Sequence, residues 1–261
     1  MARRQRPTTR AAVTSPGQQP DLRERILADF AALRVPLTAE QLDAALAQAT
    51  QDGWSHLAFL HRVITDQANL RRERSIQHRI HDARFRERPT LATFDGTFNA
   101  KAIHRTQIEE LATGDFIRRR QNLVFVGPSG VGKSFLVQSI GQAACVLGYR
   151  VRYVTSAALL EDLTASLADQ TLPERVRHYA RCDLLIIDEF GFDRIERAAA
   201  PQAASLWYKI IDARSQQAST ALVTNVDFDA WGDYLGDPPL ALAFLDRLVD
   251  GAIILKIQGK S

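Results

Sequence analysis

The spacing of hydrophobic residues along this chain changes near residue 90. Before that point, from Asp21 onward, apolar residues recur at the three- and four-residue intervals of an amphipathic helix. The first such face contains Leu22, Ile26, Phe30 and Leu33. Pro36 and Gly53 interrupt the pattern, and Pro89 ends it. The pattern therefore predicts a small, all-helical N-terminal domain over residues 21–88, made of three helices.

After residue 90, short apolar runs alternate with longer helical patterns. Strands are expected at residues 123–126, 151–155, 184–188, 220–224 and 252–257. Helices are expected near 100–112 and at 133–147, 157–168, 202–216 and 238–249. This alternation is typical of a parallel sheet covered by helices on both faces. We therefore expect residues 89–261 to form an α/β domain with a five-stranded parallel sheet.

The first twenty residues differ from both predicted domains. They are polar, rich in Arg, Thr, Gln and Pro, and lack any period, so we expect a disordered basic tail. No apolar stretch follows its arginines, as a secretory signal would require. No run approaches the roughly 18 apolar residues of a membrane span, so no membrane partner is expected and the protein is predicted to be cytoplasmic. Cys145 and Cys182 lack metal-ligand spacing and are expected to be buried, reduced thiols.

Basic residues are concentrated before the predicted sheet. Residues 1–120 contain twenty Lys and Arg against fourteen Asp and Glu, whereas residues 121–261 contain thirteen against sixteen. A basic excess raises the local concentration of polyanions, of which nucleic acid is the commonest. A merely solubilising surface has the same charge, so the charge alone leaves both interpretations open.

Arginines are densest at the end of the predicted helical domain. They are Arg71, Arg72, Arg74, Arg79, Arg84, Arg86 and Arg88. Such a run is often a solvated helix face. It also suits contact with phosphates, because a guanidinium group binds phosphate oxygens in bidentate fashion. We favour DNA contact for the first six of these arginines.

A phosphate-binding pattern, G-x-x-x-x-G-K-S, follows the first predicted strand and opens a predicted helix. The residues expected to hold a nucleotide are Gly127, Pro128, Ser129, Gly130, Val131, Gly132, Lys133, Ser134 and Phe135. Glycines let the backbone curl so that its N–H groups face an anion, and the helix N-terminus adds partial positive charge. Lys133 is expected to reach the β- and γ-phosphates of ATP, and Ser134 to bind Mg²⁺.

Two acids and an amide complete the predicted site. Asp188 and Glu189 follow four apolar residues, at the carboxyl end of a predicted strand, where open α/β sheets bind ligands. We expect Asp188 to hold Mg²⁺ and Glu189 to deprotonate the attacking water. Asn225 ends another strand, where its amide can bond the water or the γ-phosphate; a turn asparagine is the alternative. The predicted activity is hydrolysis of ATP to ADP and phosphate.

Together these motifs resemble the IstB-like helper ATPases, which are AAA+ proteins encoded beside the IstA transposase in insertion sequences and related to DnaC-type helicase loaders. The resemblance covers about residues 21–259. Besides the phosphate loop and the acidic strand, it rests on Trp54, Phe59, Leu60, the arginine run, Thr93-Phe94-Asp95, Asn225 with Phe228 and Trp231, and Leu245-Asp246-Arg247-Leu248.

The resemblance implies further roles and partners. Asn225 matches the sensor-1 position and Arg247 the arginine finger, which contacts ATP of a neighbouring subunit; with Lys133 and Glu189 they form the expected catalytic set. Arg214 also matches a family arginine and is a possible subunit contact. The family's biology implies a homo-oligomer joined through ATP, assembly on double-stranded DNA, and delivery of target DNA to an IstA-type transposase.

The chain departs from the family pattern at two places. The family usually continues as Gly-x-Ser-Tyr-Arg after the last strand, whereas this sequence reads Gly259-Lys260-Ser261. Lysine is a poor substitute for the planar guanidinium of that sensor-2 arginine, so weaker ATP binding or slower hydrolysis is expected. After Gly191 the sequence reads Phe192-Asp193-Arg194-Ile195 in place of a Tyr-x-Pro turn.

Three other functions fit the same motifs. A replicative helicase loader of the DnaC type would keep the fold and change the partner. A P-loop kinase would act as a monomer and would need an acceptor pocket. A DNA-binding module that holds ATP without turning it over would fit the departure at the C-terminal end.

Overall fold

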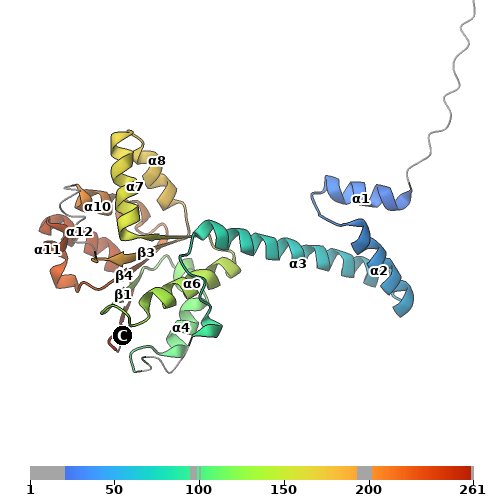
Figure 1. The fold of residues 1–261 in the computed structure, drawn as a ribbon, viewed down its shortest axis with the longest axis horizontal. Coiled ribbons are helices and arrows are strands. Elements are labelled where there is room, and N and C mark those ends of the chain that lie inside the picture. The colour runs from blue at the N-terminus through green and yellow to red at the C-terminus, as the bar shows by residue number, and fades with distance from the viewer. Residues whose placement is uncertain (1–20, 95–98, 100, 193–201, 260–261) are drawn as a thin grey trace, which may run out of the picture. The chain divides into compact units, whose positions relative to one another are not determined.

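The computed structural model describes residues 21–94, 99, 101–192 and 202–259, and these form two compact units that divide between Glu73 and Arg74 (Figure 1). The expected tail, residues 1–20, lies outside the described residues. The predicted domain boundary at residues 88/89 lies fifteen residues after this division. In the described part of the chain, no helix has the length and apolarity needed to cross a membrane.

The N-terminal unit contains the helices α1 (Leu22–Ala32), α2 (Ala39–Asp52) and most of α3 (His56–Ala83). Thr38 caps α2: its Oγ1 accepts a hydrogen bond from the Gln41 N–H, and the Gln41 side chain accepts one from the Thr38 N–H. Gly53 ends α2 in the left-handed conformation. The three predicted helices are therefore confirmed.

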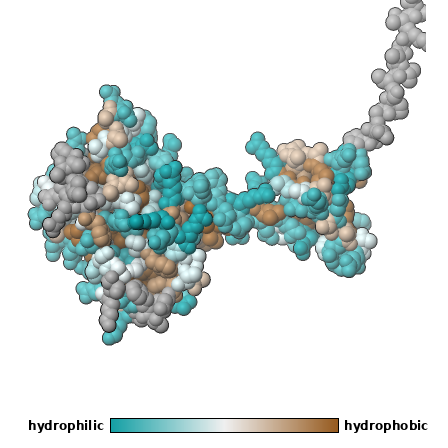
Figure 2. Space-filling model, viewed as in Figure 1, coloured by the Kyte–Doolittle hydropathy of each residue, from teal (hydrophilic) through white to brown (hydrophobic). Residues whose placement is uncertain are grey.

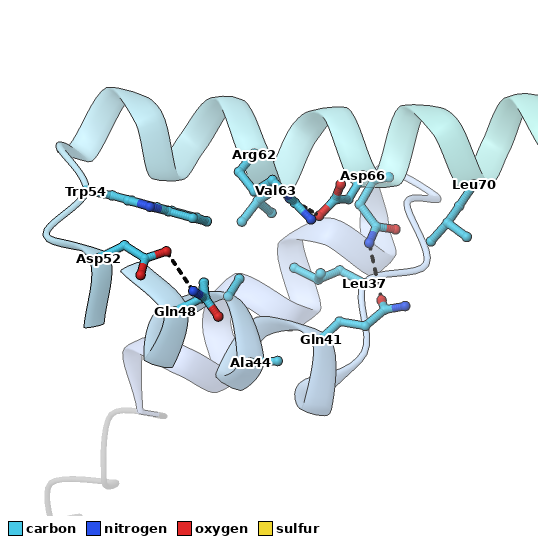
Figure 3. Close-up of a pocket in the computed structure, with 12 residues that line it drawn as sticks. Leu37, Gln41, Ala44, Gln48, Asp52, Trp54, Arg62, Val63, Asp66 and Leu70 are labelled. Carbon is cyan, nitrogen blue, oxygen red and sulfur yellow. Dashed lines mark hydrogen bonds and ion pairs between the residues drawn. The ribbon is translucent and has the colours of Figure 1, made fainter. Parts of the chain in front are cut away.

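A groove of about 490 Å³ lies between α2 and α3 of this unit (Figure 3). Its apolar wall contains Leu37, Trp54, Val63 and Leu70. Its charged groups already have partners, since Arg62 pairs with Asp66 at 2.8 Å and Gln48 bonds Asp52 at 2.6 Å. Arg62 offsets Asp66, so the groove keeps one negative charge, that of Asp52.

The core of the N-terminal unit is small. Leu42 and Val63 are its buried hydrophobic residues among those described. On α3, by contrast, Leu57, Leu60 and Ile64 stay exposed, and Figure 2 shows apolar patches on this unit amid hydrophilic surface. Because helices in proteins are stabilised mainly by packing of an apolar face, this unit has little packing to stabilise it, and the cap of α2 adds a local contribution.

The C-terminal unit is built on a parallel sheet whose strand order is β2-β3-β4-β1-β5. The strands are β1 (Leu123–Val126), β2 (Val151–Thr155), β3 (Leu184–Phe190), β4 (Ser219–Thr224) and β5 (Ile253–Lys256). β2 is an edge strand, and β1 lies between β4 and β5. The predicted five-stranded parallel sheet is confirmed, with each strand within two residues of its expected bounds.

Helices cover both faces of the sheet (Figure 1). One face packs against α7 (Ser156–Ala168), α8 (Leu172–Ala180), α10 (Ala203–Arg214), α11 (Trp231–Leu235) and α12 (Pro238–Val249). The other packs against α4 (Arg105–Ala112), α5 (Asp115–Arg118) and α6 (Lys133–Leu147). Side chains of β1 alternate between the two cores: Val124 joins the first and Phe125 the second.

An aromatic cluster fixes the end of β3 within the first core. The ring of Phe190 lies 5.2 Å from Trp207 of α10, 4.8 Å from Trp231 of α11 and 5.9 Å from Phe244 of α12, measured between centroids. Phe190 is fully buried. The last residue of β3 is thus held by three helices at once.

The helix α3 ends earlier than predicted. It stops at Ala83, not at Pro89, because Arg84 adopts a left-handed conformation with φ 57°. The last turns of α3 belong to the C-terminal unit: Arg79 Nε donates to the Cys145 carbonyl at 2.8 Å. Phe85 then packs against Tyr153 of β2, with ring centroids 6.3 Å apart.

Arg214 lies inside the C-terminal unit, so it offers almost no surface to a neighbouring subunit. Its side chain is 1% exposed. The guanidinium donates to the carbonyls of Tyr179 at 2.7 Å, Cys182 at 3.0 Å and Ser219, and to Thr220 Oγ1 at 3.0 Å. Arg214 therefore joins the end of α8 to the start of β4. Cys145 and Cys182 are both free thiols, as expected, but Cys145 is buried whereas Cys182 is only partly buried.

Replacing Arg214 with methionine is expected to lower the free energy of unfolding by about 2–3 kcal/mol, because buried carbonyls lose their donor. Chemical denaturation measures this change. The matched control is Arg177→Met, at an exposed residue of α8 that pairs with Glu174. Equal stability of the two variants would contradict a structural role for Arg214.

Candidate nucleotide-binding site

The predicted phosphate loop connects β1 to the N-terminus of α6. Gly127 lies so close to the chain that a Cβ atom there would stand 2.0 Å from the Ile257 carbonyl oxygen. Gly132, with φ 96°, caps α6 in a conformation that other residues rarely adopt. The loop therefore curls at the carboxyl end of the sheet, with the N–H groups of a 15-residue helix behind it.

Lys133 is folded onto its own loop. Its Nζ donates to the carbonyls of Gly127 at 2.8 Å and Pro128 at 2.7 Å, and the side chain is only 5% exposed. Burial lowers the pKa of Lys133, while the charge of Asp188 opposes that effect. An ammonium group that has lost much of its hydration is well suited to bind an anion.

Asp188 connects the phosphate loop to β3. Its Oδ1 accepts from Ser134 Oγ at 3.1 Å and from the Glu189 N–H at 2.8 Å, and its Oδ2 accepts from Tyr153 OH at 3.0 Å. Asp188 is 1% exposed. Burial, and then the charge of Asp188, raises the pKa of Tyr153, which keeps this phenol a hydrogen-bond donor. A hydroxyl beside a carboxylate is the oxygen donor set that Mg²⁺ prefers, so these residues fit the ion.

Glu189 has a strained backbone. Its φ is 62°, in the left-handed region, and β3 shifts register against β4 between Ile187 and Phe190. Its Oε1 accepts from Arg86 Nη1 at 2.7 Å. Non-glycine residues held in this region cluster at functional sites. The conformation is consistent with a working role for this carboxylate.

Asn225 lies beside the end of β3. A Cβ atom on Gly191, two residues after Glu189, would stand 3.0 Å from Asn225 Oδ1. The structure therefore brings the amide and the acidic strand end together. The variant turn at 192–195 can be located only at Phe192, since residues 193–195 lie outside the described residues, as does Lys260.

The remaining predicted residues lie around this centre. Phe135, at the start of α6, packs against Phe94 with ring centroids 6.0 Å apart. Arg247 is half-exposed on α12, where its Nε lies 3.3 Å from Asp212 Oδ1 and its Nη1 3.4 Å from Asp246 Oδ2. Hydrogen bonding to Asp212 raises the pKa of Arg247. Arg247 is thus placed at the surface, as a residue reaching another subunit must be.

The arginines predicted to bind DNA separate into three groups. Arg71, Arg72 and Arg74 are exposed on α3. Arg79 is tied to Cys145 and to Ser75 Oγ. Arg84 and Arg86 follow α3 in the C-terminal unit.

Two residues of the site were missed by sequence reasoning. Tyr153 and Arg86 contact Asp188 and Glu189 across 35 and 103 residues of sequence. Tyr153 had a partial signal, since it stands two residues before the end of an apolar strand. Nothing in the sequence distinguished Arg86 from its neighbouring arginines.

Comparison with known proteins assigns the family. A model of the IstB-like ATP binding protein family matches residues 28–261. The chain belongs to this family. The IstB-like relatives include the ATP-binding protein of insertion sequence IS5376 from Geobacillus stearothermophilus, which is 33% identical over 240 residues, or 92% of this chain and 94% of that protein. The IS21 protein from Pseudomonas aeruginosa is 31% identical over 229 residues, or 88% and 84%.

Solved structures place this IstB-like chain in the AAA+ fold. DnaI has a TM-score of 0.54 at 20% identity, covering 66% of this chain and 92% of that chain. The DnaC helicase loader has a TM-score of 0.53 at 19% identity, covering 65% and 96%. DnaA bound to AMPPCP and single-stranded DNA has a TM-score of 0.53 at 21% identity, but this chain covers only 52% of that one. At these identities the likeness concerns the fold alone.

Proposed function

We propose that this IstB-like protein is a Mg²⁺-dependent ATPase that assembles on double-stranded DNA and delivers target DNA to an IstA-type transposase, stimulating it. The observation that carries the enzymatic part is the juxtaposition of Lys133, Ser134 and Asp188 at the carboxyl end of the sheet, with Glu189 on strained backbone beside them. The residues proposed as binding loop, metal ligands and general base therefore lie beside one another, which supports the proposal. The insertion-sequence relatives support the partner.

Each residue has a defined task in this proposal. Lys133 exchanges its two loop carbonyls for β- and γ-phosphate oxygens of ATP. Mg²⁺, held by Ser134 and Asp188, would neutralise phosphate charge. Glu189 accepts a proton from the water that attacks the γ-phosphorus, while the bond from that phosphorus to the bridging oxygen of ADP breaks. Asn225 orients the water or the γ-phosphate.

Arg247 extends the site to a neighbouring subunit. Replacing it with alanine is expected to lower DNA-stimulated ATP hydrolysis about 100-fold, since one charge-stabilising donor of the transition state is lost. Binding of a fluorescent ATP analogue to dilute monomer should not change. Lys209→Ala, at an exposed residue of the nearby α10, is the control. Full stimulated hydrolysis by Arg247→Ala would refute the finger assignment.

The decisive experiment measures ATP-dependent assembly of the full chain on duplex DNA by light scattering and electron microscopy. We expect oligomers that need both ATP and duplex DNA, with weak dependence on DNA sequence and a steep dependence on salt. A monomer that phosphorylates a small molecule would indicate a kinase. Capture of a replicative helicase in place of the transposase would indicate a helicase loader. DNA binding without ATP turnover would indicate a DNA-binding module that only holds ATP.

A further inference from the structure

The C-terminal unit has a hollow at the amino end of the edge strand β2. The phosphate loop lies at the opposite, carboxyl end of the sheet. The volume of the hollow is about 600 Å³. We call it the basic hollow, because it is lined chiefly by His81, Arg84, Arg150, Arg152, His178 and Arg181. These residues come from the end of α3, the start of β2 and the end of α8.

Positive charge in the basic hollow exceeds negative charge. Asp82 is the one acid among its described lining residues, and it already pairs with His78 at 3.1 Å. Arg150 pairs with Asp183 at 3.0 Å, but Arg84 and Arg181 have no acidic partner among the residues that the structure describes. Nη1 of Arg152 donates a hydrogen bond to the Asp82 carbonyl at 3.3 Å. Its Nε has no acceptor in the described chain.

Helix ends explain only part of this charge. Cations at the C-termini of α3 and α8 complement the helix dipoles, which accounts for Arg84 and Arg181. Arg152 lies in β2 and Arg150 directly precedes this strand, so the dipole of a helix C-terminus does not account for either. Burial first, and then the charges of Arg152 and Arg175, lowers the pKa of His178. Nearby guanidinium groups therefore contribute to this shift, while the charge of Asp162 opposes it.

The lining also indicates which part of a nucleic acid would bind. It consists of guanidinium and imidazole groups and the carboxylate of Asp82, with Val151 and Cys182 as its only apolar side chains among the described residues. Among the described lining residues there is no Phe, Tyr or Trp ring on which a base could stack. The lining matches the backbone phosphates, which guanidinium groups bind without reading sequence.

A continuous segment connects the basic hollow to Glu189. The Asp82 carbonyl bonds Arg152 at the start of β2, and Phe85 packs on Tyr153 in the middle of this strand. Arg86 then pairs with Glu189, whose neighbour Asp188 lies opposite Thr155 at the end of β2. Residues 82–86 thus follow the edge strand from the hollow to the acidic strand end.

The contact at the far end of this segment can be broken easily. The side chains of Arg86 and Glu189 are 62% and 43% exposed, and solvent-exposed ion pairs are weak. While the pair persists, Oε1 of Glu189 accepts from a guanidinium, and the carboxylate is held toward Arg86. Arg84, two residues before Arg86, is an exposed member of the basic hollow.

We propose that the basic hollow binds backbone phosphates of duplex DNA, and that this binding moves Arg84 and Arg86 and releases Glu189 to accept a proton from water. Arg86 is then a positioning residue, which holds the general base inactive until DNA is present. The inference rests on the proposed ATPase function and adds the site through which DNA stimulates it.

Binding to the basic hollow is tested with the full-length double variant Arg84→Gln/Arg181→Gln and a random-sequence duplex. Two lost phosphate contacts are expected to reduce the slope of log K against log salt by about 2 and to weaken binding roughly 10- to 100-fold near physiological salt. The matched control is Arg105→Gln/Arg118→Gln, which removes two exposed arginines that pair with Glu109 and Asp115. Identical slopes for the two double variants would overturn the assignment. So would a variant Arg84→Gln/Arg181→Gln that lost binding of single-stranded DNA or inorganic triphosphate more than binding of the duplex.

The link to Glu189 is tested with Arg86→Ala by measuring ATP hydrolysis with and without duplex DNA. The rate without DNA is expected to rise toward the stimulated wild-type rate, so that the stimulation ratio falls toward one while KM for ATP stays unchanged. Arg86→Lys should restore part of the stimulation. A wild-type ratio in Arg86→Ala would overturn the link. If wild-type protein showed no DNA-stimulated hydrolysis, the proposed function would fail. If DNA stimulated the wild type and the variants to the same extent, only this inference would fail.

Discussion

Replacing Lys133 with alanine is expected to weaken ATP binding about 1000-fold, or ~4 kcal/mol, because two charge-assisted hydrogen bonds to phosphates are lost. The effect should be large because Lys133 is 5% exposed and held within the loop, so its ammonium group has little hydration left to lose on binding phosphate. Calorimetric titration with ATP and Mg²⁺ measures the change. ATP-dependent assembly on DNA should be lost with it.

The same variant should remain folded. Burial lowers the pKa of Lys133 below its unfolded value, so the charged lysine disfavours the folded state at neutral pH, and this cost declines as the pH rises through the folded pKa. The nucleotide-free alanine variant is therefore expected to unfold at the wild-type temperature or slightly above. Lys209→Ala is the control for both measurements. Tight ATP binding by Lys133→Ala would contradict the assignment of the phosphate loop.

Replacing Glu189 with glutamine is expected to preserve ATP binding and to lower hydrolysis about 1000-fold, within the range for loss of a general base. The amide keeps the size of the side chain and an oxygen that can still accept from Arg86, so the strained backbone at φ 62° need not change. Steady-state release of phosphate measures the rate. The variant should accumulate as a DNA-bound, ATP-loaded oligomer.

Glu174→Gln is the matched control, since Glu174 is an exposed glutamate whose partner is Arg177 of the same helix. It should hydrolyse ATP at the wild-type rate. If Glu189→Gln hydrolysed ATP as fast as this control, another group would have to take the proton, and the role of Glu189 would be excluded.

The fold was predictable where local signals agree. The helix α6 has its predicted bounds because Gly132 and Gly148 both take left-handed conformations at its ends. By contrast, α8 and α11 were not predicted as helices, although Pro173 near the start of α8 was a usable signal. The end of α3 was predicted too late, since packing of Phe85 on β2, a tertiary contact, breaks the helix before Pro89 does.

The site was predictable where its residues form contiguous sequence motifs. The loop 127–134 and the acids Asp188 and Glu189 are contiguous motifs, and a parallel sheet brings them to one edge. The contact of Arg86 with Glu189 depends on where a segment before the sheet crosses it, 103 residues away in sequence. Spacing rules do not describe such contacts. The role of Asn225 remains a prediction, and so does that of Arg247, which the Arg247→Ala variant tests.

The aromatic cluster around Phe190 limits how Glu189 can move. Asp188 before it and Phe190 after it are both almost wholly enclosed, one by hydrogen bonds and the other by rings from three helices. The backbone of Glu189 is therefore fixed by its neighbours on both sides. Its carboxylate must change position by rotation of its own side chain while the strand stays still, so switching this residue requires no remodelling of the sheet.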